Sequence, residues 1–213
     1  MFEALKVVGR AFAAWWREWP LLMLLNLAWL ALQIPIITGP PATAAMYAMA
    51  RRVADGELVS PKQAWQSLRD MFRPAWGWGL ANAVIVVVVI GNFVAYGSAP
   101  GLGWAALRLA WGSIATLWFA VNLFYWPFWL AQADRRLVTT LRNALLMFLK
   151  APGFSLTLLL VCAALALVSV AVTLPLAVAL ISWLALIGVL AVDATLRRPD
   201  LVEPSAPIEM DAL

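Results

Sequence analysis

The chain has 213 residues, of which 64% are hydrophobic and 12% charged, and its formal net charge is +4. Soluble domains are nearer half apolar and a quarter charged, so the composition argues against a soluble enzyme or binding module. The sequence predicts no soluble fold with a basic face that carries base-stacking aromatic residues, as nucleic-acid binding would require. No nucleic-acid partner is therefore expected.

Charged residues are missing from four long blocks of the chain: 19–50, 75–107, 109–133 and 151–192. A water-soluble helix needs a polar face, and a chain of this length has no core large enough to hide all four blocks. Helices are the natural way to cross lipid, because each satisfies its own backbone hydrogen bonds. We therefore predict an all-α, polytopic membrane protein.

The first block, 19–50, is too long for one span and too short for two. It is interrupted by a predicted turn, whose prolines cannot continue a helix: Thr38, Gly39, Pro40 and Pro41. We predict a short or re-entrant helical hairpin, in which 21–37 enters the membrane and 42–52 returns. A cleavable signal peptide is the alternative, although the region before it is unusually long and aromatic.

Four later stretches have the length and apolarity of full transmembrane helices: 75–95, 107–130, 154–173 and 176–192. Pro175 marks the turn between the last two. The β-branched run 84–90 would suggest a buried strand in a soluble protein, but its charge-free flanks favour a helix here.

An amphipathic stretch precedes each pair of apolar segments, at 2–19, 60–73 and 134–150. In the second, Ser60 can cap a helix and Pro61 suits its first position. In the first, large apolar side chains alternate with Lys and Arg: Phe2, Leu5, Phe12, Trp15, Trp16 and Trp19. We predict helices lying at the cytoplasmic interface. Solvated linkers are the alternative, but they leave the aromatic residues unexplained.

The order of interfacial helix, proline, helix, turn, helix and basic pair recurs in the units 2–52, 60–136 and 134–198. We predict one integral membrane domain, 1–198, and a flexible cytoplasmic tail, 199–213. A true repeat would place its symmetry axis along the membrane normal, because each unit begins and ends on the same side. Proline-marked helix starts can also produce this pattern without any repeat.

The distribution of basic residues orients the chain. With a hairpin in the first block, 14 of the 15 Lys and Arg residues face the cytoplasm and Arg108 alone lies outside. With a single span there, 11 would lie inside. The positive-inside rule therefore favours the hairpin, with both termini in the cytoplasm.

The segment 26–47 begins Asn-Leu-Ala-Trp and continues from 35 as Pro-Ile-Ile-Thr-Gly-Pro-Pro-Ala-Thr-Ala-Ala. It resembles the YesL-like family of bacterial membrane proteins, whose members carry Asn-Leu-x-Trp and then Pro-x-x-Thr-x-Gly-Pro-Ala-Thr-Ala-Ala. The doubled proline Pro40-Pro41 departs from that pattern. The resemblance implies a protein of the bacterial cytoplasmic membrane without an assigned activity. Its relatives are often encoded beside ABC-type carbohydrate importers and sugar-degrading enzymes.

A few amide side chains are the candidate functional positions within the membrane: Asn26, Gln33, Asn82, Asn92 and Asn122. None is ionisable, whereas proton-coupled carriers usually place charged groups within their spans. The amides could join helices by hydrogen bonds or line a substrate pathway. The 13 tryptophans could stack on sugars, although most fall at predicted interfaces, where tryptophan anchors helices.

No catalytic, metal-binding or cofactor-binding residue is predicted. The chain has no histidine to act as a base and a single cysteine, Cys162, which leaves a zinc site without its usual ligands. The leading interpretation is a non-enzymatic accessory or regulatory partner of ABC-type carbohydrate uptake. A small solute carrier or channel, acting alone or as an oligomer, is the alternative. A membrane enzyme would need a catalytic group among loop residues such as Asp55, Glu57 and Asp70.

The expected partners are the lipid bilayer and either importer subunits or a second copy of the chain.

Overall fold

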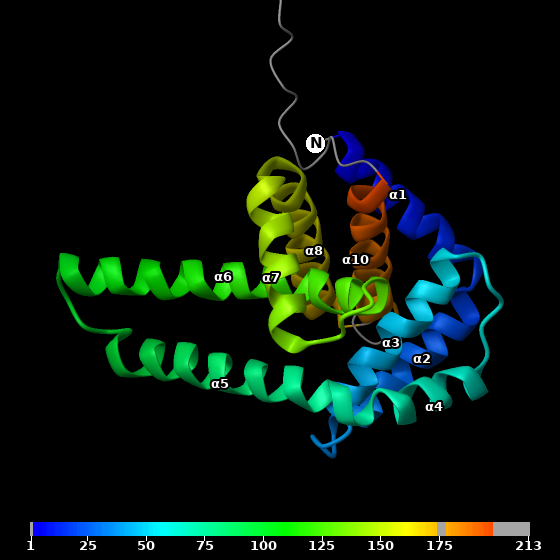
Figure 1. Cartoon of the computed structure of the whole chain (residues 1–213). Helices are drawn as coiled ribbons and strands as arrows, with labels where there is room; N and C mark the ends of the chain where they lie inside the picture. Colours follow the sequence, from blue (N-terminus) through cyan, green and yellow to red (C-terminus); the bar gives the residue numbers. More distant parts are fainter. Residues whose placement is uncertain (1, 174–177, 198–213) are drawn as a thin grey trace, which may run out of the picture.

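The computed structural model describes residues 2–173 and 178–197 (Figure 1). All regular secondary structure over these residues is helical, which confirms the predicted all-α class. The helices are α1 (Phe2–Arg17), α2 (Trp19–Gln33), α3 (Gly39–Ala54), α4 (Pro61–Asp70), α5 (Phe72–Tyr96), α6 (Leu102–Ala131), α7 (Leu137–Lys150), α8 (Pro152–Val172) and α10 (Leu180–Arg197). The turn predicted at Pro175 and the predicted tail 199–213 lie outside the described residues.

Four described helices are long and apolar enough to cross a membrane: α5, α6, α8 and α10, with 25, 30, 21 and 18 residues. Their number matches the prediction, and α2 is the shorter apolar helix expected near the N-terminus. The last helix runs to Arg197, beyond the predicted limit at 192. The second of the four begins at Leu102, five residues before the predicted limit at 107.

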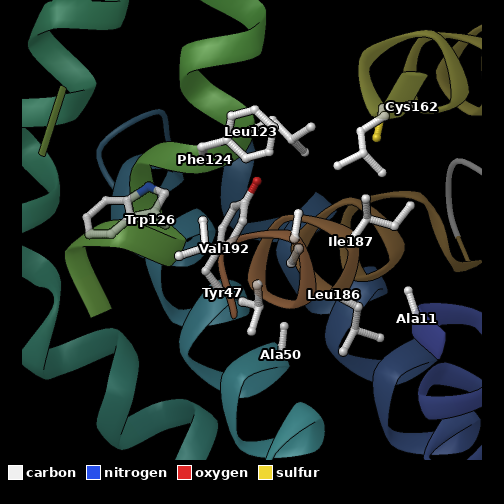
Figure 2. Close-up of a cluster of buried hydrophobic side chains, with 14 of the residues drawn as sticks. Ala11, Tyr47, Ala50, Leu123, Phe124, Trp126, Cys162, Leu186, Ile187 and Val192 are labelled. Atoms are coloured by element: carbon white, nitrogen blue, oxygen red, sulfur yellow. The ribbon is translucent and has the colours of Figure 1, made fainter. Parts of the chain in front are cut away.

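The core of the molecule forms around α10. Helices α1, α3 and α6 pack against it, and its buried side chains include Leu186, Ile187 and Val192 (Figure 2). Gly188 permits the close approach of α6, because a Cβ there would lie 2.5 Å from the Leu123 carbonyl oxygen. The last of the described helices is therefore the one against which the N-terminal helices α1 and α3 pack.

Helix α1 has two apolar faces. Phe2, Phe12 and Trp16 are exposed, as a face in contact with lipid requires. Trp15 was predicted to lie at the membrane interface with these residues, but it is buried and its Nε1 donates to Ser182 Oγ on α10 at 3.0 Å. Trp15 belongs to a second stripe at helical spacing, which packs α1 against the protein: Ala4, Val7, Ala11 and Trp15.

Helix α4 begins at the predicted cap, where Ser60 Oγ accepts a hydrogen bond from the Gln63 backbone N–H. Its apolar side faces α2 and α3, and Leu68 is buried against Ala42 and Ala45. Trp65 remains more than half exposed beside Arg69. Part of the face predicted to meet lipid is thus used for packing within the protein.

The turn between α2 and α3 occupies 34–38, slightly earlier than predicted. Gly39, Pro40 and Pro41 do not form that turn and instead begin α3. Prolines are compatible with the first turn of a helix, because the backbone N–H groups there have no partner within the helix. Ile36, in the turn itself, adopts a positive φ of 60°.

Helices α5 and α6 form a hairpin that extends away from the rest of the molecule and lies crosswise to α8 and α10 (Figure 1). Arg108 closes the tip of this hairpin by donating to the carbonyl oxygens of Tyr96 and Ala99, at 3.2 and 2.9 Å. The Tyr96 ring stacks on Trp104, with 4.9 Å between centroids. The lone basic residue of the predicted outer side therefore caps the end of α5.

Candidate functional site

Two tryptophan–asparagine pairs join α5 to α6 near the base of the hairpin. Trp78 Nε1 on α5 donates to Asn122 Oδ1 on α6 at 2.8 Å. In the reverse direction, Trp118 Nε1 on α6 donates to Asn82 Oδ1 on α5 at 3.0 Å. Each asparagine follows the tryptophan of its own helix by four residues, so the same spacing produces a reciprocal arrangement. We call these four residues the Trp–Asn ladder.

The amide nitrogen of each asparagine donates a hydrogen bond within its own helix. Asn82 Nδ2 donates to the Trp78 carbonyl at 2.9 Å, and Asn122 Nδ2 donates to the Trp118 carbonyl at 2.8 Å. A polar group in an apolar interior is costly unless it is hydrogen-bonded. The four polar side chains of the ladder therefore stabilise one antiparallel register of α5 and α6. Each interhelical hydrogen bond contributes about 0.6–2 kcal/mol.

Three residues of the α2–α3 hairpin line the same cavity as the ladder: Trp29, Thr43 and Tyr47. Trp29 Nε1 on α2 donates to Thr43 Oγ1 on α3 at 2.9 Å, and Thr43 Oγ1 donates to the Gly39 carbonyl at 3.1 Å. Tyr47, one helical turn after Thr43, is 5% exposed. Its hydroxyl is directed toward Leu123 and Phe124 on α6 (Figure 2).

A cavity of about 540 Å³ lies between these elements, and we call it the ladder cavity. Its volume falls within the range of about 300–1,000 Å³ typical of small-molecule sites. The lining is predominantly apolar and comes from α2, α3, α5, α6 and α10: Trp29, Thr43, Tyr47, Trp78, Asn82, Ile85, Val86, Val89, Ile90, Ala115, Trp118, Phe119, Asn122, Leu123, Ile181 and Leu184.

Comparison with known proteins matches one segment of the chain to a family. Residues 22–93 match the family described as "Protein of unknown function, DUF624". The match covers about a third of the chain. No curated protein and no solved structure matches the chain.

The DUF624 segment contains α3, α4 and most of α2 and α5, and it contributes one half of the ladder. Trp29, Thr43, Tyr47, Trp78 and Asn82 all lie within it. The other half of the ladder, on α6, lies beyond it. The ladder cavity is thus formed where the DUF624 segment meets the helices that follow.

Of the five predicted amide positions, the structure brings Asn82 and Asn122 together and places the other three elsewhere. Asn26 is fully buried, and its Oδ1 accepts from the backbone N–H groups of Ile181 and Ser182 at 3.1 and 3.3 Å. Backbone N–H groups in the first turn of a helix have no partner within it. Asn26 therefore serves the start of α10, 155 residues later in the chain.

Gln33 and Asn92 act locally. Gln33 Nε2 donates to the Trp29 carbonyl at 3.3 Å, and a Cβ at Gly39 would lie 2.8 Å from Gln33 Oε1. Asn92 is partly buried and donates to the Val88 carbonyl of its own helix at 2.8 Å. The five amides therefore do not line a common path through the described residues.

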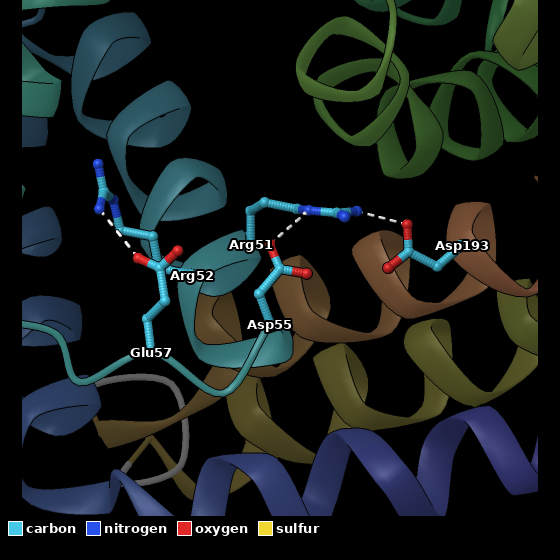
Figure 3. Close-up of polar contacts among 5 residues, drawn as sticks. All are labelled: Arg51, Arg52, Asp55, Glu57 and Asp193. Carbon is cyan, nitrogen blue, oxygen red and sulfur yellow. Dashed lines mark hydrogen bonds and ion pairs between the residues drawn. The ribbon is translucent and has the colours of Figure 1, made fainter.

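An ionic cluster joins the C-terminal ends of α3 and α10 (Figure 3). The Arg51 guanidinium pairs with Asp193 on α10 and, at 3.0 Å, with Asp55. Burial of the guanidinium opposes its charge, but the hydrogen bonds and charges of Asp193 and Asp55 outweigh this effect and raise the pKa of Arg51. Arg52 pairs separately with Glu57 at 3.0 Å, near the surface.

Sequence reasoning identified the asparagines of the ladder but not their partners. Most tryptophans were interpreted as interfacial anchors, and no partner was predicted for Trp78 or Trp118. The available signal was the repeated spacing Trp-x-x-x-Asn in two consecutive apolar segments, 78–82 and 118–122. Residues four apart share a helix face, so this spacing could have predicted a reciprocal contact.

Proposed function

We propose that this chain is a non-enzymatic, YesL-like protein of the bacterial cytoplasmic membrane that assists or regulates an ABC-type carbohydrate importer. The likeness at 26–47 motivates the family name and the link to carbohydrate uptake, and it lies within the DUF624 segment. The proposal places both termini in the cytoplasm, as the distribution of basic residues indicates.

The observation that carries an accessory role is an exposed stripe on α5, which we call the outer stripe: Leu80, Val84, Val87 and Val94. The exposed fractions of these four side chains lie between 54% and 80%, and those of Val94 and Val87 are the highest, at 80% and 70%. The intervals of four, three and seven residues keep the stripe on one face. That spacing is typical of helices that pack against another helix in a membrane.

The polar groups of the hairpin support a binding role rather than a catalytic one. The amide groups of the ladder asparagines form their hydrogen bonds within and between α5 and α6. The hairpin therefore presents an apolar, internally fastened surface to its surroundings. Such a surface fits the transmembrane helices of a partner subunit.

The test is co-purification from native membranes after photo-crosslinking at the outer stripe. A photoreactive group introduced at Val87 should crosslink importer subunits in stoichiometric amounts, whereas one at Leu160 on α8, which is 69% exposed, should crosslink mainly lipid. Val87→Phe should reduce the yield of the complex, and Leu160→Phe should leave it unchanged. Recovery of the chain with no importer subunit at either position would refute the proposal.

A further inference from the structure

We propose that the ladder cavity binds one phospholipid, with an acyl chain lying along α5 and α6 and an ester carbonyl accepting a hydrogen bond from Tyr47. This is a ligand site distinct from the outer stripe, because it uses the opposite face of α5. Ile85 and Val89 line the cavity and are less exposed than Val84 and Val87, which point away from it.

The shape of the cavity fits one acyl chain. Its lining on α5 runs from Trp78 to Ile90, a distance of about 18 Å along the helix. The hydrocarbon core of a bilayer is about 30 Å thick, so one leaflet contributes about 15 Å. The cavity therefore has the length of a single leaflet. Val86, Ile90 and Phe119 are each at least 40% exposed, so one side opens toward lipid.

The polarity of the cavity changes along this length. Its hydrogen-bonding side chains come from the ladder, α2 and α3, at the base of the hairpin. The part toward the tip is formed by Ile85, Val86, Val89, Ile90 and Ala115. An amphipathic lipid has the same asymmetry, with its oxygens at one end. Trp78 lies about 9 Å along the helix from the start of α5, near the depth at which the polar layer meets the hydrocarbon.

Tyr47 supplies an independent indication of a ligand. Its side chain is 5% exposed and lines the cavity, and its hydroxyl makes no hydrogen bond to the residues that the structure describes. The hydroxyl oxygen is not one of the fully enclosed unpaired polar atoms among these residues, so it keeps access to open space. Buried hydroxyl groups are nearly always hydrogen-bonded. An ester carbonyl arriving with the polar end of a lipid would accept this hydrogen bond, since the tyrosine O–H can donate.

The experiment uses the full chain in vesicles of phosphatidylethanolamine and phosphatidylglycerol. A variable fraction of the phosphatidylglycerol carries a diazirine midway along one acyl chain, and mass spectrometry locates the crosslinks. We expect labelling of the Ile85–Val89–Ile90 region to saturate at a low fraction of photoactivatable lipid. Labelling of α8 at Leu160 and Leu167, which are exposed by 69% and 72%, should rise in proportion to that fraction and serves as the internal control.

Three variants test the cavity itself. Ala115→Phe fills it and should reduce labelling near Ile85 several-fold without changing that of α8. Ala110→Phe, at an exposed alanine of the same helix, is the matched control and should change neither. Should Ala115→Phe fail to fold, Val86→Trp obstructs the open side from the lipid phase and should give the same loss. Unsaturable labelling, or labelling that neither obstructing variant reduces, would overturn the site.

Tyr47→Phe tests the hydrogen bond, because it removes the hydroxyl and little else. The half-saturating lipid fraction should rise about fivefold, which is the effect expected from the loss of one neutral hydrogen bond. An unchanged half-saturation would overturn the role of Tyr47. Competition with unlabelled lipids identifies the class of lipid that binds. Loss of labelling on addition of unlabelled phosphatidylglycerol supports a phospholipid site. Loss of labelling with oleate but not with phosphatidylglycerol would overturn it.

Discussion

Trp78 and Asn122 are joined by a 2.8 Å hydrogen bond between α5 and α6, and the same bond recurs in reverse between Trp118 and Asn82. The hairpin is therefore fastened twice at one level, close to where it leaves the body of the protein. Beyond that level the two helices offer few polar contacts to each other until Arg108 closes the tip.

Replacing Asn122 by leucine should destabilise the protein by about 1–3 kcal/mol, because it leaves the part-buried Trp78 N–H without an acceptor. The measurement is reversible unfolding in mixed micelles. The double variant Asn122→Leu/Trp78→Phe should recover part of the loss, since it removes both partners. Equal losses in the single and double variants would show that the indole hydrogen bond contributes nothing.

Asn26→Leu should lower the free energy of unfolding by about 1–2 kcal/mol, because Ile181 and Ser182 at the start of α10 would lose their shared acceptor. Asn92→Leu is the matched control, since Asn92 is only partly buried and its amide donates to Val88 within α5. Its effect should stay within about 0.5 kcal/mol. Similar effects from both substitutions would contradict the capping role of Asn26.

Gly188→Ala should be strongly destabilising, since the added methyl group would meet the Leu123 carbonyl oxygen at 2.5 Å and Pro127 at 3.2 Å. Overpacking of this kind costs about 1–3 kcal/mol. Gly112→Ala, on α6, has open space around it and should be neutral or stabilising by up to about 1 kcal/mol. Thermal unfolding of the two variants side by side provides the comparison.

Asp193→Asn should destabilise the contact between α3 and α10 by about 1–2 kcal/mol, since its partner Arg51 is partly buried and retains only Asp55. Glu57→Gln removes the exposed pair with Arg52 and should cost no more than about 0.5 kcal/mol. The difference should persist in high salt, which screens exposed pairs most. A loss from Asp193→Asn that disappears in salt would place this pair among the surface interactions.

Topology can be tested with cysteines in a Cys162→Ser background. Cysteines at Lys6 and Asp55 should resist an impermeant thiol reagent in intact cells, because both positions are proposed to face the cytoplasm. A cysteine at Leu102, which is 88% exposed near the hairpin tip, should react and serves as the positive control. Reaction at Lys6 but not at Asp55 would mean that the first apolar block crosses the membrane once.

Charge-free blocks and proline positions were sufficient to predict four spans, the short first hairpin and the start of α4 at Ser60. They could not predict which helices meet, because a span that is apolar on all sides carries no directional pattern. Trp15 illustrates the limit: its aromatic character suited a lipid interface, but its spacing from Ala4, Val7 and Ala11 placed it against α10. Asn26 was found as a polar residue, while its partner lay 155 residues away.

The crosswise direction of the α5–α6 hairpin has a mechanical consequence. Helices that cross a bilayer tilt by about 20° on average and by no more than about 40°. For both pairs of long helices to stand upright in one flat bilayer, the hairpin must turn relative to α8 and α10. The chain departs from helix beside the hairpin at Met71 and at 132–136. The buried part of α6 around Leu123 packs against Gly188 of α10, so such a rotation must also repack this contact. With α5 as a lever of about 37 Å, a modest rotation at its base carries the tip across most of a leaflet.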